Sequence, residues 1–141
     1  MKKQDSKKAA PIMGMPDYRW NNRVVLITED EEVNFYYLKT LLQRADAKVI
    51  RAKNGKEAVD IITEYEGGVD LILMDLNMPV MDGYEAMRII KSRHPAIPII
   101  AQTAYTMNND RNRCLQAGFN DYIAKPINRM ALYRMVNDNF S

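Results

Sequence analysis

Short apolar segments alternate with longer amphipathic segments along most of the chain. The apolar segments are rich in Val, Ile and Leu and are expected to be strands at 24–28, 48–52, 70–74, 97–101 and 121–124. The segments that follow them repeat their apolar residues at helical spacing and predict helices at 32–44, 55–65, 84–93, 108–117 and 130–140. Pro95 and Gly118 stand where two of these helices are expected to end. The predicted order is five β-α units.

The predicted strands are apolar on both faces. The run Leu71-Ile72-Leu73-Met74 contains no polar residue, which is expected when helices cover both sides of a parallel sheet. The fold class is therefore α/β, a doubly wound sheet of five parallel strands. Two strand orders compete, 3-2-1-4-5 and 2-1-3-4-5. We favour 2-1-3-4-5, the flavodoxin-like (βα)5 order, because it makes the first and third strands neighbours and both of these strands are followed by acidic residues.

The length of 141 residues suits one domain with a single core. Residues 1–22 are polar, interrupted by prolines and without periodicity, so they are expected to form a disordered linker or tag. The folded domain is expected to span residues 23–141. Tyr18 and Trp20 are the exception in the first segment, since an aromatic pair just before a strand often packs back on the domain edge.

Charge and cysteine content exclude several classes of protein. Lys and Arg total 20 and Asp and Glu total 18, so the net charge of +2 gives no field that would favour direct nucleic acid binding. The apolar runs are far shorter than the roughly 20 residues of a membrane span, and no membrane segment is expected in this chain. Cys114 is the only cysteine, which excludes an intramolecular disulfide and favours a cytoplasmic location.

Charged residues directly follow three of the predicted strands. Glu29 and Asp30 follow the first strand, Asp75 follows the third, and Lys125 follows the fifth and precedes a proline. Clustered carboxylates repel one another unless a cation compensates them. Oxygen ligands without His or Cys suit a hard ion, and an incomplete ligand set suits Mg²⁺. The pattern predicts a Mg²⁺-dependent site for phosphoryl transfer.

Four motifs lie at the ends of the first, third, fourth and fifth predicted strands. They are VVLITED at 24–30, LMDLNMPVMDG at 73–83, AQTA at 101–104 and DYIAKPI at 121–127. In this order they resemble the receiver domain of two-component response regulators, a CheY-like domain, and most of all the receiver of hybrid histidine kinases. The resemblance covers residues 23 to about 140.

The resemblance implies a role for each charged residue. Asp75 would be the phosphoacceptor, taking a phosphoryl group from a phosphohistidine on a partner. Asp30 and Asp75 would bind Mg²⁺ together with the backbone carbonyl of Asn77, and Glu29 would bind the ion through water or support the site. Lys125 would pair with Asp75 before the transfer and with a phosphoryl oxygen after it. Such a domain catalyses its own phosphorylation and dephosphorylation and is not a conventional enzyme.

The resemblance also implies a switch. Thr103 would donate its hydroxyl to the phosphoryl group, and Tyr122 would turn inward, changing the surface formed by 108–117, 121–124 and 130–140. Without the resemblance, the more ordinary interpretation of Tyr122 is a half-buried strand aromatic.

The implied partner is a histidine kinase or a histidine phosphotransfer domain, and the switch surface would also allow a homodimer. The implied location is cytoplasmic, including the cytoplasmic part of a membrane-bound sensor kinase. Asn77 and Tyr105 would control access of the water that removes the phosphoryl group.

Two other functions compete with this interpretation. A phosphatase of the haloacid-dehalogenase type also uses Mg²⁺ and an aspartyl nucleophile, but it carries Asp-x-Asp after its first strand, whereas Asp75-Leu76-Asn77 follows the third strand here. A pseudo-receiver would serve only as an interaction surface. The presence of Asp30, Asp75, Thr103 and Lys125 argues against it.

Overall fold

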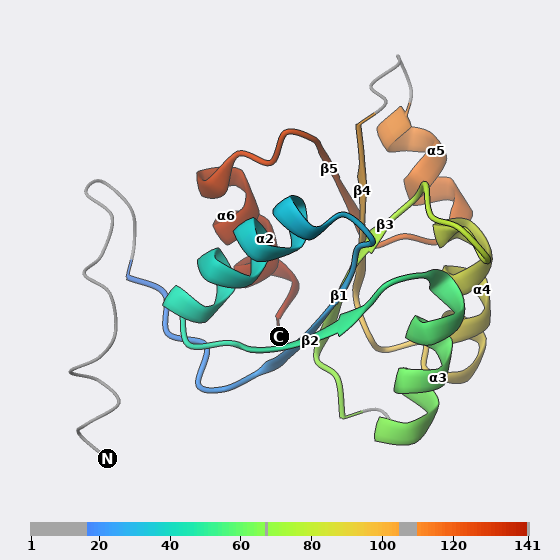
Figure 1. Ribbon diagram of the computed structural model, residues 1–141, viewed down its shortest axis with the longest axis horizontal. Coiled ribbons are helices and arrows are strands. Elements are labelled where there is room, and N and C mark those ends of the chain that lie inside the picture. Colours follow the sequence, from blue (N-terminus) through green and yellow to red (C-terminus); the bar gives the residue numbers. More distant parts are fainter. Residues whose placement is uncertain (1–16, 67, 105–109, 141) are drawn as a thin grey trace.

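The computed structural model describes residues 17–66, 68–104 and 110–140. Its parallel strands form one sheet in the order β2-β1-β3-β4-β5 (Figure 1). The strands are β1 (Val24–Thr28), β2 (Lys48–Ala52), β3 (Leu71–Asp75), β4 (Ile99–Thr103) and β5 (Asp121–Ala124). The helices are α2 (Glu32–Arg44), α3 (Gly55–Tyr65), α4 (Gly83–Arg93), α5 (Asp110–Ala117) and α6 (Arg129–Asn139). The predicted fold class and strand order are confirmed.

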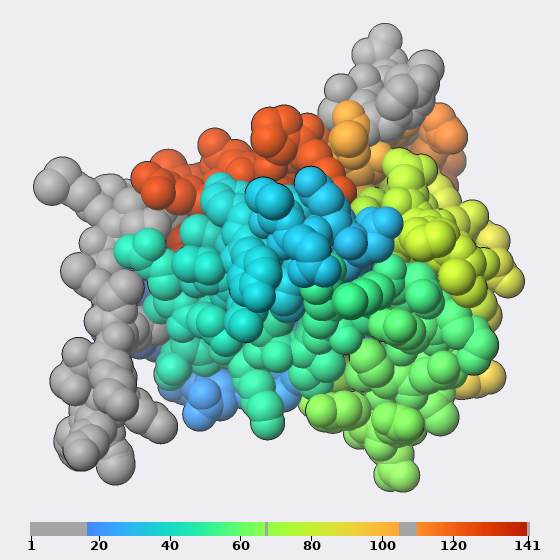
Figure 2. Space-filling model, in the orientation of Figure 1, coloured from blue at the N-terminus to red at the C-terminus, as the bar shows by residue number. Residues whose placement is uncertain are grey.

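Helices cover both faces of the sheet. Helices α2 and α6 lie on one face, and α3, α4 and α5 lie on the other (Figure 1). Successive strand residues point to opposite faces, so Val25 and Ile27 pack with α2 and α6 while Leu26 packs with α3 and α4. The apolar character of the strands on both faces follows from this arrangement. Figure 2 shows one face of the molecule, on which α2 in light blue to teal and α3 in green are exposed.

Two strands begin later than their apolar runs. Asp70 is the first residue of the predicted third strand, but β3 begins one residue later. The carboxylate of Asp70 instead accepts a hydrogen bond from the Val24 N–H at 2.7 Å. Pro98 has no N–H to give to a ladder, and β4 begins at the residue after it. Both strands also end later than predicted. Asp75 and Thr103 are the last residues of β3 and β4, where the sheet hydrogen bonds fix their backbones.

Helices α3, α4 and α6 begin at side-chain caps. Asn54, Asp82 and Asn128 each accept a hydrogen bond from a backbone N–H three residues further on, at 2.9 Å in every case. A cap of this kind contributes about 1 kcal/mol to stability. Because Asp82 is the cap, α4 begins at Gly83, one residue earlier than the apolar periodicity indicates.

Trp20 is part of the packed domain, although it precedes residue 23, where the sequence predicts the domain to begin. Its side chain is 4% exposed, and its indole N–H donates to Oδ1 of Asn137 at 2.9 Å. The ring contacts the rings of Tyr18, Tyr133 and Phe140. The aromatic pair therefore closes the end of the core between α2 and α6, while residues 1–16 of the predicted linker lie outside the described residues.

None of the helices in the described part of the chain has the length and apolar content needed to cross a membrane.

We expect Trp20→Ala to lower the free energy of unfolding by about 3–5 kcal/mol, since a buried aromatic ring and its hydrogen bond are lost. Urea unfolding followed by circular dichroism measures the change. Arg19→Ala is the matched control, because the neighbouring Arg19 side chain is 46% exposed. A loss below about 1 kcal/mol for Trp20→Ala would contradict the packing of this segment.

Candidate functional site

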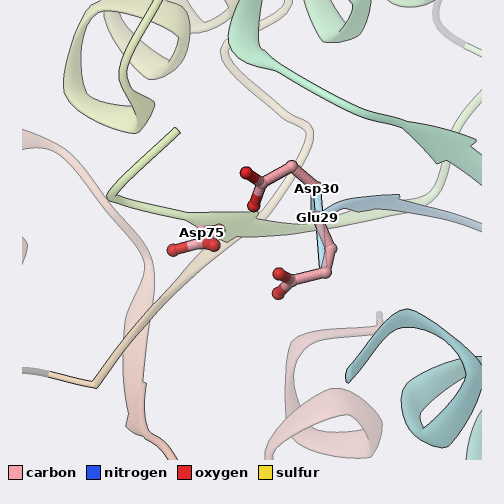
Figure 3. A group of neighbouring side chains, drawn as sticks. All are labelled: Glu29, Asp30 and Asp75. Atoms are coloured by element: carbon pink, nitrogen blue, oxygen red, sulfur yellow. The ribbon is translucent and has the colours of Figure 1, made fainter. Parts of the chain in front are cut away.

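The carboxyl ends of β1 and β3 bring three acidic side chains together. The two strands are neighbours in the sheet, Glu29 and Asp30 follow β1, and Asp75 ends β3. One carboxylate oxygen from each residue lies within 4.8 Å of the other two, and Figure 3 shows the three side chains gathered at this edge of the sheet. Glu29 and Asp75 are 0% and 4% exposed, whereas Asp30 is exposed. The strand order thus produces the convergence that the sequence predicted.

Lys125, which directly follows the edge strand β5, contacts two of these carboxylates. Its own N–H donates to the carbonyl of Thr103 at 2.8 Å, and its peptide bond to Pro126 is cis. Its Nζ lies 3.2 Å from Oε1 of Glu29 and 3.2 Å from Oδ2 of Asp75. One ammonium group therefore compensates two buried carboxylates.

Burial is the main cause that raises the pKa of Asp75, to about 6. The N–H of Asn77, which donates to Oδ1 at 3.1 Å, opposes this shift. The charge of Glu29 adds to it, and Lys125 opposes it again. Burial acts to lower the pKa of Lys125, but the charges of Asp75 and Glu29 together raise it. Asp75 is thus a carboxylate held in an unfavourable environment, beside a firmly charged lysine.

Glu29 is held more completely than Asp75. The Glu31 N–H donates to Oε2 at 3.1 Å and the Asn34 side-chain amide donates to Oε1 at 2.7 Å, in addition to the Lys125 contact. Sequence reasoning missed Asn34. Its position in the first turn of α2, directly after the acidic residues, is the signal that could have identified it.

Gly83 allows α4 to begin directly against the end of β3. A Cβ atom at this position would lie 2.6 Å from the carbonyl oxygen of Asp75 and 3.0 Å from Cα of Leu76, closer than real Cβ contacts. The Gly83 N–H also donates to the Leu76 carbonyl, at 3.3 Å. A side chain at this position would displace the peptide that carries Asp75.

Thr103 and Tyr122, the residues of the predicted switch, share one pocket. Thr103 is 3% exposed, and Tyr122 is half-buried in β5, where burial raises the pKa of its hydroxyl. Both line a pocket of ≈ 740 Å³ together with Tyr84 of α4 and Cys114 of α5. The pocket adjoins the acidic cluster through Asn77. Thr103 and Tyr122 thus line the same pocket, while Tyr105 lies outside the described residues.

Gln102 is a second residue that sequence reasoning assigned no role. It pairs in register with Asp75 and is 1% exposed, yet neither amide atom has a hydrogen-bond partner within the part of the chain that the structure describes. A buried polar group without a partner costs about 1–3 kcal/mol. The sequence gives the position of Gln102 on its strand but not the surroundings of its amide.

Comparisons with known proteins identify a family that the chain resembles over most of its length. A sequence model described as the response regulator receiver domain matches residues 25–137. The hybrid signal transduction histidine kinase I of Dictyostelium discoideum is 40% identical over 120 residues, which are 80% of this chain and 7% of that protein. The polar-differentiation response regulator DivK of Brucella anthropi is 40% identical over 107 residues, 73% of this chain and 84% of that protein. The chain therefore spans most of one relative and a small part of the other.

Two solved structures are similar over nearly the whole folded region. The receiver domain of the sensor histidine kinase PA1611 from Pseudomonas aeruginosa, with a magnesium ion coordinated in its active-site cleft, is 37% identical at a TM-score of 0.76, covering 84% of this chain and 98% of that one. The receiver domain of Ssk1 from Saccharomyces cerevisiae, in complex with the histidine phosphotransfer protein Ypd1, is 34% identical at a TM-score of 0.75, covering 85% of this chain and 90% of that one.

Without metal, Asp75→Asn is expected to raise the free energy of unfolding at pH 8 by about 1–2 kcal/mol. The folded-state pKa of about 6 lies above the ordinary value of 3.8, so the parent gains stability as the pH falls through 6 towards 4, and the variant lacks this gain. Urea unfolding in chelator at pH 5 and pH 8 measures the difference between the two proteins. Asp60→Asn, on the exposed face of α3, is the control. A variant less stable than the parent at pH 8 would contradict the expectation.

Proposed function

This chain belongs to the response regulator receiver family, and we propose that it accepts a phosphoryl group on Asp75 in a two-component phosphorelay. The observation that carries the proposal is the position of Lys125 Nζ, 3.2 Å from both Asp75 and Glu29. Phosphoryl transfer depends on positioning and charge neutralisation more than on covalent assistance. A buried carboxylate beside a fixed ammonium group and further acidic ligands supplies both.

We propose Mg²⁺ as the cofactor. Oxygens bound to one Mg²⁺ at about 2.1 Å lie roughly 3–4 Å apart, so the three acidic oxygens, within 4.8 Å of one another, come onto one ion with small side-chain rotations. Asp30, Asp75 and the backbone carbonyl of Asn77 would hold it, and Glu29 would bind the ion through water or support the site. The ion would neutralise charge on the oxygens of the transferred phosphoryl group.

The proposed transfer uses groups already in place. An oxygen of Asp75 attacks the phosphorus of a phosphohistidine on the partner, the P–O bond forms as the P–N bond breaks, and the imidazole leaves with the bonding electrons and takes up a proton. Lys125 releases its contact with Asp75 and pairs with a phosphoryl oxygen. The Asn77 N–H, which donates to Oδ1 of Asp75, keeps the carboxylate oriented throughout.

We propose that phosphorylation is transmitted through Thr103 and Tyr122. Both residues line the same ≈ 740 Å³ pocket, which continues to α5 through Arg113 and Cys114. A Thr103 hydroxyl bonded to the phosphoryl group would favour an inward position of the Tyr122 ring. Because the new contact exists only in the phosphorylated state, it shifts the population between two conformations, and the surface of α5, β5 and α6 changes.

The proposed partner is a histidine kinase or a histidine phosphotransfer domain that docks on α2. Val33 and Tyr36 are 76% and 60% exposed, so their side chains are accessible to a partner. The same turn of α2 supplies Asn34, which contacts Glu29, so a partner docked on these side chains lies beside the site. Such a docking surface would serve a phosphohistidine donor of protein size and would not be needed by a small phosphoryl donor.

We further propose a receiver domain that begins near Tyr18, with the residues before it as a linker. Burial of Trp20 supports this limit. A cytoplasmic location and a homodimer through α5, β5 and α6 are proposals that rest on the family resemblance.

Acetyl phosphate with Mg²⁺ is expected to add one phosphoryl group to the parent protein and none to Asp75→Asn, since the nucleophile is lost. Intact-mass measurement at neutral pH detects the addition. Asp60→Asn, remote from the site on α3, should be labelled like the parent. Equal labelling of Asp75→Asn would exclude Asp75 as the phosphoacceptor.

Val33→Ala with Tyr36→Ala is expected to slow transfer from a phosphohistidine donor about tenfold, a loss of roughly 1.4 kcal/mol of docking energy. The donor is a phosphorylated histidine phosphotransfer domain that labels the parent, and radiolabel transfer gives the rate. Labelling by acetyl phosphate should be unchanged, because a small donor needs no docking surface. Tyr65→Ala is the control, because Tyr65 is an exposed tyrosine on a different helix, α3. Parental transfer rates in the double variant would show that the partner docks elsewhere.

A further inference from the structure

Arg51, in the edge strand β2, binds the turn that carries two of the acidic residues. Its Nε and Nη2 both donate to the carbonyl oxygen of Glu29, at 3.2 and 3.1 Å. Its Nη1 donates to Oε1 of Glu32 at 2.8 Å, and the guanidinium lies over the ring of Phe35, with Cζ 4.3 Å from the ring centroid. The planar group is therefore held by contacts with three residues, Glu29 before α2 and Glu32 and Phe35 within α2.

The carbonyl that Arg51 binds belongs to the peptide group joining Glu29 to Asp30. The pairing of β1 with β2 ends at Thr28 and Ala52, and the Glu29 N–H donates to the Ala52 carbonyl at 2.9 Å. Beyond that point the Glu29 carbonyl meets the Arg51 side chain in place of a backbone donor. Both polar backbone groups of Glu29 are thus held by β2.

The orientation of this peptide sets the directions of two side chains. Glu29 and Asp30 leave consecutive positions at the end of β1, and Figure 3 shows both side chains beside Asp75. A rotation of the peptide between them would turn the two carboxylates relative to each other and to Asp75. The two hydrogen bonds from Arg51 oppose such a rotation, since a planar fork holds its acceptor in a defined direction.

The charge of Arg51 acts in the opposite sense. A guanidinium near a cation site repels the cation, and on that ground alone its removal would favour metal binding. Glu32 offsets part of this charge, and the hydrogen bond from Arg51 is the main cause that lowers the pKa of Glu32. Positioning and repulsion therefore predict opposite effects of the same substitution.

We propose that Arg51 is a positioning residue for the Mg²⁺ site, acting through the Glu29 carbonyl to hold the carboxylates of Glu29 and Asp30 in their binding arrangement. The inference rests on the proposed function, because it presupposes that the acidic cluster binds Mg²⁺. Residues that orient metal ligands from behind typically change metal affinity by 10–100-fold when they are removed.

The test is a titration of the parent and its variants with MgCl₂, followed by the NMR signal of the Asn77 amide. Arg51→Met removes the charge and the hydrogen bonds but keeps an unbranched apolar chain against Phe35. Arg51→Lys keeps the charge but cannot form the planar fork. We expect about tenfold weaker Mg²⁺ binding in Arg51→Met and an intermediate affinity in Arg51→Lys. The spectrum without metal shows whether each variant is folded.

Lys53→Met is the matched control for charge. Lys53 is exposed one residue beyond the end of β2 and also lowers the pKa of Glu32 through its charge. We expect this variant to bind Mg²⁺ as tightly as the parent or slightly more tightly.

Each outcome decides between the ideas. Parental or tighter Mg²⁺ binding by Arg51→Met would overturn the positioning role and leave only repulsion. Parental binding by Arg51→Lys would show that the planar fork is not needed, and would also overturn it. A parent protein that does not bind Mg²⁺ at all would instead contradict the proposed function.

Discussion

The site depends on one ammonium group that lies between two buried carboxylates. Glu29 and Asp75 come from different strands, and neither is exposed enough for water to stabilise its charge. Taking such groups out of water costs several kcal/mol each unless a counter-charge compensates. Lys125 provides this counter-charge at 3.2 Å from both. Because β1 and β3 must be neighbours for the contact to form, the strand order and the charge arrangement require each other.

The two buried carboxylates are not equivalent. Glu29 accepts hydrogen bonds from the Glu31 N–H and the Asn34 amide in addition to its contact with Lys125, whereas Asp75 accepts from the Asn77 N–H at Oδ1 and from Lys125 at Oδ2. Burial raises the pKa of Asp75 to about 6. Under the proposed function, Glu29 would hold charge and geometry, and Asp75 would form the bond to phosphorus and bind the cation.

The fold can be predicted well from the sequence, because the apolar pattern and the residues that follow each strand are visible in short segments of the chain. Apolar runs on both faces identify buried parallel strands, and the acidic residues after the first and third runs select the strand order. The first residues of β3 and β4 are harder to predict. They depend on a hydrogen bond from the Val24 N–H to the Asp70 carboxylate and on the missing N–H of Pro98. The contacts of Arg51 could not be predicted from the sequence, because its long side chain extends from β2 to the Glu29 carbonyl and to Glu32 of α2.

The position of the site at the sheet edge explains how it can act on both faces. Alternation along the strands puts Leu73 and Ile123 on the face of α2 and α6, and Met74 and Tyr122 on the face of α3, α4 and α5. Inside the sheet the strands separate these faces, whereas Asp75 and Lys125 lie where the strands end. A group bound to Asp75 there can contact Lys125 and the pocket of Thr103 at once. Under the proposed function, a phosphoryl group on Asp75 would act on the α5 side through Thr103 and Tyr122, which line one pocket at the strand ends.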